Sequence, residues 1–84
     1  MTPDEAIAVV EATLDAPTLR VDRILAREDP AFYLLVVLDT NFGRRDEGPV
    51  ANGPRLVDKV SGEVTRLTVP DAVARAKRMS LVWT

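Results

Sequence analysis

Apolar residues recur at helical spacing near the start of the chain. Ile7, Val10 and Leu14 stand three and four residues apart, so a helix places them on one face. Residues 2–5 supply an N-cap threonine, a proline suited to the first helical turn and a glutamate that completes a capping box. We therefore predict a helix over residues 3–14, which the following proline ends.

The two apolar segments that follow predict β-strands. In residues 19–25 the apolar positions change face at Ile24, and a β-bulge near residues 22–23 reconciles them. Residues 31–38 are all apolar and rich in β-branched and aromatic side chains, which favours a central strand. Both faces of such a strand require cover, for which a partner or a second copy of the chain is one option.

A β-hairpin is predicted over residues 55–67, with strands at 55–58 and 63–67. The carboxylate of Asp58 can accept backbone N–H groups within the turn, and Gly62 supplies the positive φ that closes a bulged hairpin. The residues that we assign to turn structure here and just before the hairpin are Asn52, Gly53, Pro54, Asp58, Ser61 and Gly62.

A second helix is predicted to begin at residues 68–71, where Thr68 is the N-cap and a proline follows early. A short apolar tail at residues 81–83 ends the chain. Its predicted apolar stripe consists of Val69, Val73 and Ala76, and Ala72 and Met79 lie on the flanks of this stripe.

The order of helix, two strands, loop, hairpin and helix predicts an α+β fold, with one domain over residues 1–84. We expect an antiparallel meander of three to four strands in sequence order (αββββα). The N-terminal helix packs across this sheet. The short C-terminal helix shares that face or lies at an edge.

Composition narrows the possible functions. The chain carries 11 Lys+Arg and 13 Asp+Glu, a net charge of −2, which argues against a dedicated nucleic-acid binder. It has no Cys and no His, which excludes disulfides, Cys-ligated zinc and the usual nucleophile pairs. No acidic pair is spaced for catalysis, so we expect no enzyme, no catalytic residue, no cofactor and no metal. The absence of a signal peptide and of a long apolar run predicts a cytoplasmic protein that does not enter the membrane.

Candidate binding residues lie in a loop and in the tail. Residues 40–51 lack apolar periodicity, and a loop of this length is often functional. Its central charges are Arg44, Arg45, Asp46 and Glu47. This mixed-charge patch is either solvated or selects a protein partner. Trp83 either folds back onto the core, caps a sheet edge or anchors another chain.

Two further groups have simple structural explanations. Arg75, Lys77 and Arg78 suit the negative end of a helix dipole, although such cations also bind phosphate or acidic proteins. A cation site at residues 58–63 has too few oxygen ligands for a calcium loop, so a self-capped turn is favoured there.

Residues 52–64 read Asn-Gly-Pro-Arg-Leu-Val-Asp-Lys-Val-Ser-Gly-Glu-Val. This stretch resembles the characteristic hairpin of the YrhB-like proteins, also called the immunity protein thirty-five family. The shared features are Asn-Gly-Pro, a hydrophobic pair, an Asp-Lys/Arg turn with Ser/Thr-Gly, then Glu and a hydrophobic residue. The resemblance implies a small intracellular bacterial protein, often encoded beside polymorphic toxins, that neutralises one of them. A chaperone-like role has also been attached to this group, and the family has no catalytic residues.

These features together predict a non-catalytic protein-binding module of the immunity type, which neutralises a bacterial toxin by direct binding. The alternative is a chaperone-like or self-associating subunit of a larger assembly. The expected partner is another protein rather than nucleic acid or a membrane, and a homodimer is compatible with both functions.

Overall fold

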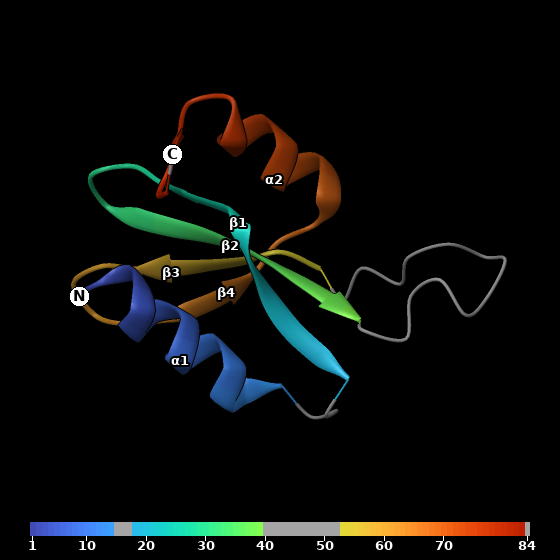
Figure 1. Ribbon diagram of the computed structural model, residues 1–84. Helices are drawn as coiled ribbons and strands as arrows, with labels where there is room; N and C mark the ends of the chain where they lie inside the picture. The colour runs from blue at the N-terminus through green and yellow to red at the C-terminus, as the bar shows by residue number, and fades with distance from the viewer. Residues whose placement is uncertain (15–17, 40–52, 84) are drawn as a thin grey trace, which may run out of the picture.

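The computed structural model describes residues 1–14, 18–39 and 53–83, which Figure 1 shows as a ribbon. Two helices accompany one antiparallel sheet with the strand order β4-β3-β2-β1-β5. The elements in chain order are α1 (Pro3–Thr13), β1 (Leu19–Glu28), β2 (Phe32–Asp39), β3 (Arg55–Asp58), β4 (Val64–Arg66), α2 (Val69–Ala76) and β5 (Ser80–Leu81).

The predicted α+β class is confirmed, and the first four strands form the predicted meander. The prediction of three to four strands was one strand short. The apolar tail returns to the sheet as β5, where Leu81 lies opposite Arg27 and Ser80 opposite Glu28. This pairing joins segments that are distant in sequence, so no local pattern predicted it.

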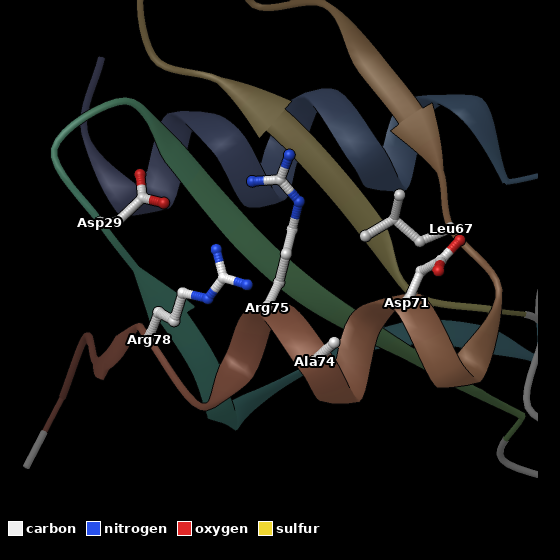
Figure 2. Close-up of a pocket in the computed structure, with 6 residues that line it drawn as sticks. All are labelled: Asp29, Leu67, Asp71, Ala74, Arg75 and Arg78. Carbon is white, nitrogen blue, oxygen red and sulfur yellow. The ribbon is translucent and has the colours of Figure 1, made fainter.

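The central strand β2 is covered on both faces, each by a different helix. Its side chains alternate, so Tyr33 and Leu35 point toward α1 and Leu34 points toward α2. Figure 2 shows α2 in front of the sheet and α1 behind it. The core on the α1 face comprises Ala6, Ile7, Val10, Val21, Ala26, Tyr33, Leu35, Val37 and Val57, and the core on the α2 face comprises Leu34, Leu56, Ala72 and Met79.

The structure corrects the predicted position of the second helix and its apolar stripe. α2 neither shares the face of α1 nor lies at an edge, because it covers the opposite face of the sheet. Val69 and Val73 are exposed, whereas Ala72 and Met79 are buried and Ala76 packs against them. The two alanines have little side-chain volume, so the helix can approach the sheet closely on that side.

β1 contains the predicted bulge, which spans more residues than expected. Between Asp22 and Arg27 on β1, the paired residues on β2 advance only from Val36 to Leu34. Oδ1 of Asp22 accepts the backbone N–H of Ile24 at 2.9 Å, a local bond that holds the irregular backbone. The bulge therefore changes which side chains of β1 face the core.

Both helices begin at the predicted caps. Thr2 and Glu5 form the reciprocal capping box, with the Thr2 N–H donating to Glu5 Oε1 at 2.8 Å. This bond from the Thr2 backbone lowers the pKa of the Glu5 carboxyl. Thr68 caps α2 by accepting the Asp71 N–H at 3.3 Å. Across the residues that the structure describes, no helix is both long and apolar enough to cross a membrane.

Candidate functional site

Exposed apolar side chains gather where the bulge of β1 meets the C-terminal tail. Ile24 and Leu25 lie on the bulge, and Ile24 is 78% exposed. Leu81 and Trp83 are also exposed and lie on the tail, which pairs with the end of β1. We call Arg23, Ile24, Leu25, Leu81 and Trp83 the bulge–tail surface. Its four apolar members, all except Arg23, are half of the eight large hydrophobic side chains that are exposed within the described ranges.

The tail is held beside the bulge by main-chain bonds. The N–H of Val82 donates to the carbonyl of Ala26 at 2.9 Å, and Val82 itself packs against the core of the α1 face. Leu81 and Trp83, on either side of this partly buried residue, are both exposed.

An arginine holds the tryptophan ring in place. The guanidinium carbon of Arg23 lies 4.4 Å from the centre of the Trp83 ring, and its Nη2 lies 2.7 Å from Oδ1 of Asp4. Arg23, Ile24 and Trp83 together line a shallow pocket of about 280 Å³. Stacking on a cation orders the ring without burying it, and Trp83 remains 39% exposed. The pocket thus combines an ordered aromatic ring, an aliphatic side chain and a cation.

A second recess lies along α2 on the other side of the sheet from α1. It has a volume of about 480 Å³, and Figure 2 shows the six side chains that line it. They are Asp29, Leu67, Asp71, Ala74, Arg75 and Arg78. The guanidinium carbon of Arg75 lies 5.1 Å from the centre of the Phe32 ring, so this side chain is directed over the sheet. We call this recess the α2 groove.

The predicted partner-binding residues have different outcomes. Trp83 is 39% exposed, stacks on Arg23 of β1 and belongs to neither hydrophobic core. The other four, Arg44, Arg45, Asp46 and Glu47, lie outside the described residues, as does the turn residue Asn52.

The predicted hairpin turn is confirmed. Oδ1 of Asp58 accepts the backbone N–H groups of Val60 at 2.7 Å and Ser61 at 3.0 Å. These bonds, first that from Ser61 and then that from Val60, hold the pKa of the Asp58 carboxyl below its ordinary value of 3.8. Gly62 has φ of +76°, and its N–H donates to the Asp58 carbonyl at 2.9 Å. Among the described residues, no three acidic side chains lie close enough to hold a metal ion.

The residues before the hairpin form a packed entry to β3. Gly53 has φ of +83°, and the carbonyl of Pro54 accepts the N–H of Leu67 at 2.9 Å. Arg55 is buried, and its Nη1 donates to the carbonyl of Gly53. Burial lowers the pKa of Arg55, with a smaller contribution from the charge of Arg66 opposite it on β4. Gly53 and Pro54 therefore serve the local structure of the hairpin.

Sequence reasoning missed the bulge half of the bulge–tail surface. The signal was present in Ile24 and Leu25, because two consecutive residues of a strand cannot both face one core. The predicted bulge explained the change of face but not which side chains it would expose. Arg23 carried no signal, since its partners Asp4 and Trp83 are distant in sequence.

Comparison of the chain with protein-family models, curated proteins and solved structures gives no match. The resemblance at residues 52–64 therefore stays a prediction, and the described surfaces are the basis for the function proposed below.

Proposed function

We propose that this protein is a non-catalytic binding module that contacts a protein partner through the bulge–tail surface. The observation that carries this proposal is the exposed ring of Trp83, stacked on Arg23 and bordered by Ile24. Tryptophan and arginine are the side chains most often found at the energetic centre of protein interfaces. An exposed, preordered ring loses little conformational freedom on binding.

The immunity type is the particular form of this function that the sequence resemblance favours. In that form the partner is a bacterial toxin, and this protein neutralises it by occupying part of its surface. The charge pattern suits such selective contact, because Arg23 is paired with Asp4 at the border of an apolar patch. Paired charges at the rim of an interface favour one partner over others more than they add affinity.

The test is co-expression with each protein that is encoded by a neighbouring gene and kills the host cell when it is expressed alone. Trp83→Ala removes the ring, and Ile24→Asp places a charge in the pocket beside it. Val60→Asp is the matched control, since Val60 is an apolar residue that is 97% exposed in the hairpin turn, away from the bulge–tail surface. Circular dichroism verifies that each variant is folded.

We expect the wild-type protein and Val60→Asp to protect cells, and the other two variants to lose protection and direct binding. Equal survival with and without the wild-type protein contradicts the immunity function. Full protection by both Trp83→Ala and Ile24→Asp contradicts the bulge–tail surface as the binding site.

Self-association is the second candidate, and the edge position of β5 favours it. Ser80 and Leu81 are exposed, and β5 pairs with β1 on one side only. A short edge strand beside apolar side chains can pair with a second copy of the chain. Sedimentation over a concentration series distinguishes the two functions. A dimer that Leu81→Asp dissociates supports self-association, and a monomer at every concentration contradicts it.

A further inference from the structure

The α2 groove contains two guanidinium groups, those of Arg75 and Arg78, that form no ion pair within the described residues. Arg75 and Arg78 stand three residues apart around the end of α2, so both lie on one side of the helix. Neither forms an ion pair with any residue in the described ranges. Arg75 is oriented by its stacking on Phe32. A guanidinium presents several N–H donors in a planar fork, and its preferred partner is an oxyanion such as a carboxylate.

The carboxylates that line the same groove already have structural roles. Oδ1 of Asp29 accepts the backbone N–H groups of Ala31 at 2.8 Å and Phe32 at 2.7 Å. Asp71 lies in the first turn of α2, where a negative charge suits the helix dipole. Figure 2 shows Arg75 and Arg78 between Asp29 and Asp71. The groove therefore presents an acidic group, two basic groups and an acidic group along its length.

We infer that the α2 groove binds an extended peptide segment whose central acidic side chain is flanked by basic side chains. The central carboxylate pairs with Arg75 and Arg78, and the flanking cations lie near Asp29 and Asp71. Leu67 and Ala74 supply the apolar wall for the aliphatic parts of the segment. The volume of about 480 Å³ lies within the range of about 300–1,000 Å³ typical of ligand pockets.

The same features disfavour a polyanion. A nucleic acid would bring several phosphates past Asp29 and Asp71, and like charges repel. The ring of Phe32 is covered by Arg75 and is not free on that face to stack on a base. The net charge of −2 adds no general attraction for polyanions.

This site is separate from the bulge–tail surface, with which it shares no lining residue. The inference therefore does not rest on the proposed function. A variant of Trp83 is expected to leave binding at the α2 groove unchanged, and loss of the groove is expected to leave Trp83 stacked on Arg23.

The test is fluorescence anisotropy with a labelled peptide, Gly-Lys-Ala-Glu-Ala-Lys-Gly, titrated with the intact protein. We expect saturable binding with a Kd below about 1 mM. The charge-reversed peptide, Gly-Glu-Ala-Lys-Ala-Glu-Gly, has the opposite pattern and is expected to bind at least about tenfold more weakly. A labelled single-stranded oligonucleotide and a polyglutamate peptide serve as polyanion probes.

Variants assign the binding to the groove. The double variant Arg75→Ala with Arg78→Ala is expected to lose affinity for the first peptide by about tenfold or more. Lys77→Ala is the matched control, because Lys77 lies between them in sequence and carries the same charge but does not line the groove. The double variant Arg75→Lys with Arg78→Lys keeps both positive charges but loses the planar guanidinium groups, and we expect it to bind with intermediate affinity. It also controls for misfolding, because it retains long cationic side chains at both positions.

Four outcomes overturn the inference. The first is an absence of binding to the wild-type protein, and the second is an equal loss of affinity in Lys77→Ala. The third is tighter binding of the oligonucleotide or of polyglutamate than of the mixed-charge peptide, which assigns the groove to polyanions. The fourth is wild-type affinity in the double alanine variant, which excludes the two arginines as the binding groups.

Discussion

The guanidinium of Arg27 on β1 donates a hydrogen bond to the main-chain carbonyl of Met79, 3.2 Å away, beyond the end of α2. The same Nη1 also lies 3.4 Å from the carbonyl oxygen of Ala76 in the last turn. Carbonyl groups at the end of a helix have no partner within the helix, and a cation there also suits the helix dipole. Arg27 therefore links β1, the strand that contains the bulge, with the C-terminal end of α2, the helix that borders the groove.

Replacement of Arg27 by alanine is expected to reduce the free energy of unfolding by about 1–2 kcal/mol. The loss arises because the Met79 carbonyl loses the Arg27 donor, the Ala76 carbonyl keeps only the Met79 N–H, and the helix end loses its cation. Denaturation by urea measures the effect. Arg20→Ala is the control on the same strand, since Arg20 is exposed, and an equal loss there would contradict the capping role.

Gly62→Ala is expected to destabilise the protein by about 1–2 kcal/mol, because an L-residue is strained at φ of +76°. Space is a minor factor, since the added Cβ lies 3.3 Å from the flexible end of the Met1 side chain. Gly62→Asn is the informative companion, because asparagine tolerates this conformation better. Thermal unfolding of the two variants should rank asparagine above alanine. The reverse order would show that steric contact, not backbone strain, dominates.

Stability is expected to fall in acid through the turn carboxylate of Asp58. Its folded-state pKa is lowered by the N–H groups of Ser61 and Val60, so the stabilisation is complete above the ordinary value of 3.8. It is lost as the pH falls through the lower pKa of the folded state. Glu5, lowered from 4.5 by its bond with the Thr2 backbone, contributes in the same direction.

Urea midpoints measured at a series of pH values check this behaviour. The midpoint of the wild-type protein is expected to fall more steeply below about pH 4 than that of Asp58→Asn, because the variant has no carboxylate to protonate. Parallel profiles for the two proteins would exclude a contribution from Asp58.

Met79→Ala and Val73→Ala test the face of α2 that packs on the sheet. Met79 is 7% exposed within the core of the α2 face, so its truncation is expected to cost about 2–3 kcal/mol. Val73 is 52% exposed, and its truncation is expected to change stability by less than about 0.5 kcal/mol. Chemical denaturation of both variants measures the two changes in the free energy of unfolding. A larger loss of stability for Val73→Ala would indicate that the predicted stripe of Val69, Val73 and Ala76 faces the sheet.

Trp83 is the only tryptophan of the chain, so its fluorescence reports on the bulge–tail surface directly. Arg23→Ala uncovers one face of the ring, and we expect acrylamide to quench its emission more strongly. Stability should change by less than about 1 kcal/mol, because Arg23 and its partner Asp4 are both exposed. Arg20→Ala serves as the charge-matched control. Identical quenching in both variants would contradict the stacked arrangement.

Features set by neighbouring residues were predictable from the sequence. The capping box of Thr2 and Glu5 and the turn closed by Asp58 and Gly62 each depend on residues within four positions of one another. The existence of the bulge also followed from a local change in apolar parity before Ile24. Local hydrogen bonds and backbone preferences explain these elements without reference to the rest of the molecule.

The surfaces that carry the proposals needed the folded chain. Both the packing of α2 on the second face of the sheet and the return of the tail as β5 join segments that are far apart in sequence. Both sides of α2 carry apolar residues, so the sequence did not show which side would be buried. The position of the helix on the sheet buries Ala72 and Met79 and leaves Val69 and Val73 exposed.

The amino-acid order thus accounts for the elements of this protein, their caps and turns, and the meander of its first four strands. The contact of Arg23 with Trp83 and the grouping of Arg75 and Arg78 with Asp29 arose only when distant segments packed together. The reason is physical: caps and turns satisfy hydrogen bonds within a few residues. A surface site, by contrast, is composed of side chains whose neighbours are chosen by the packing of the whole chain.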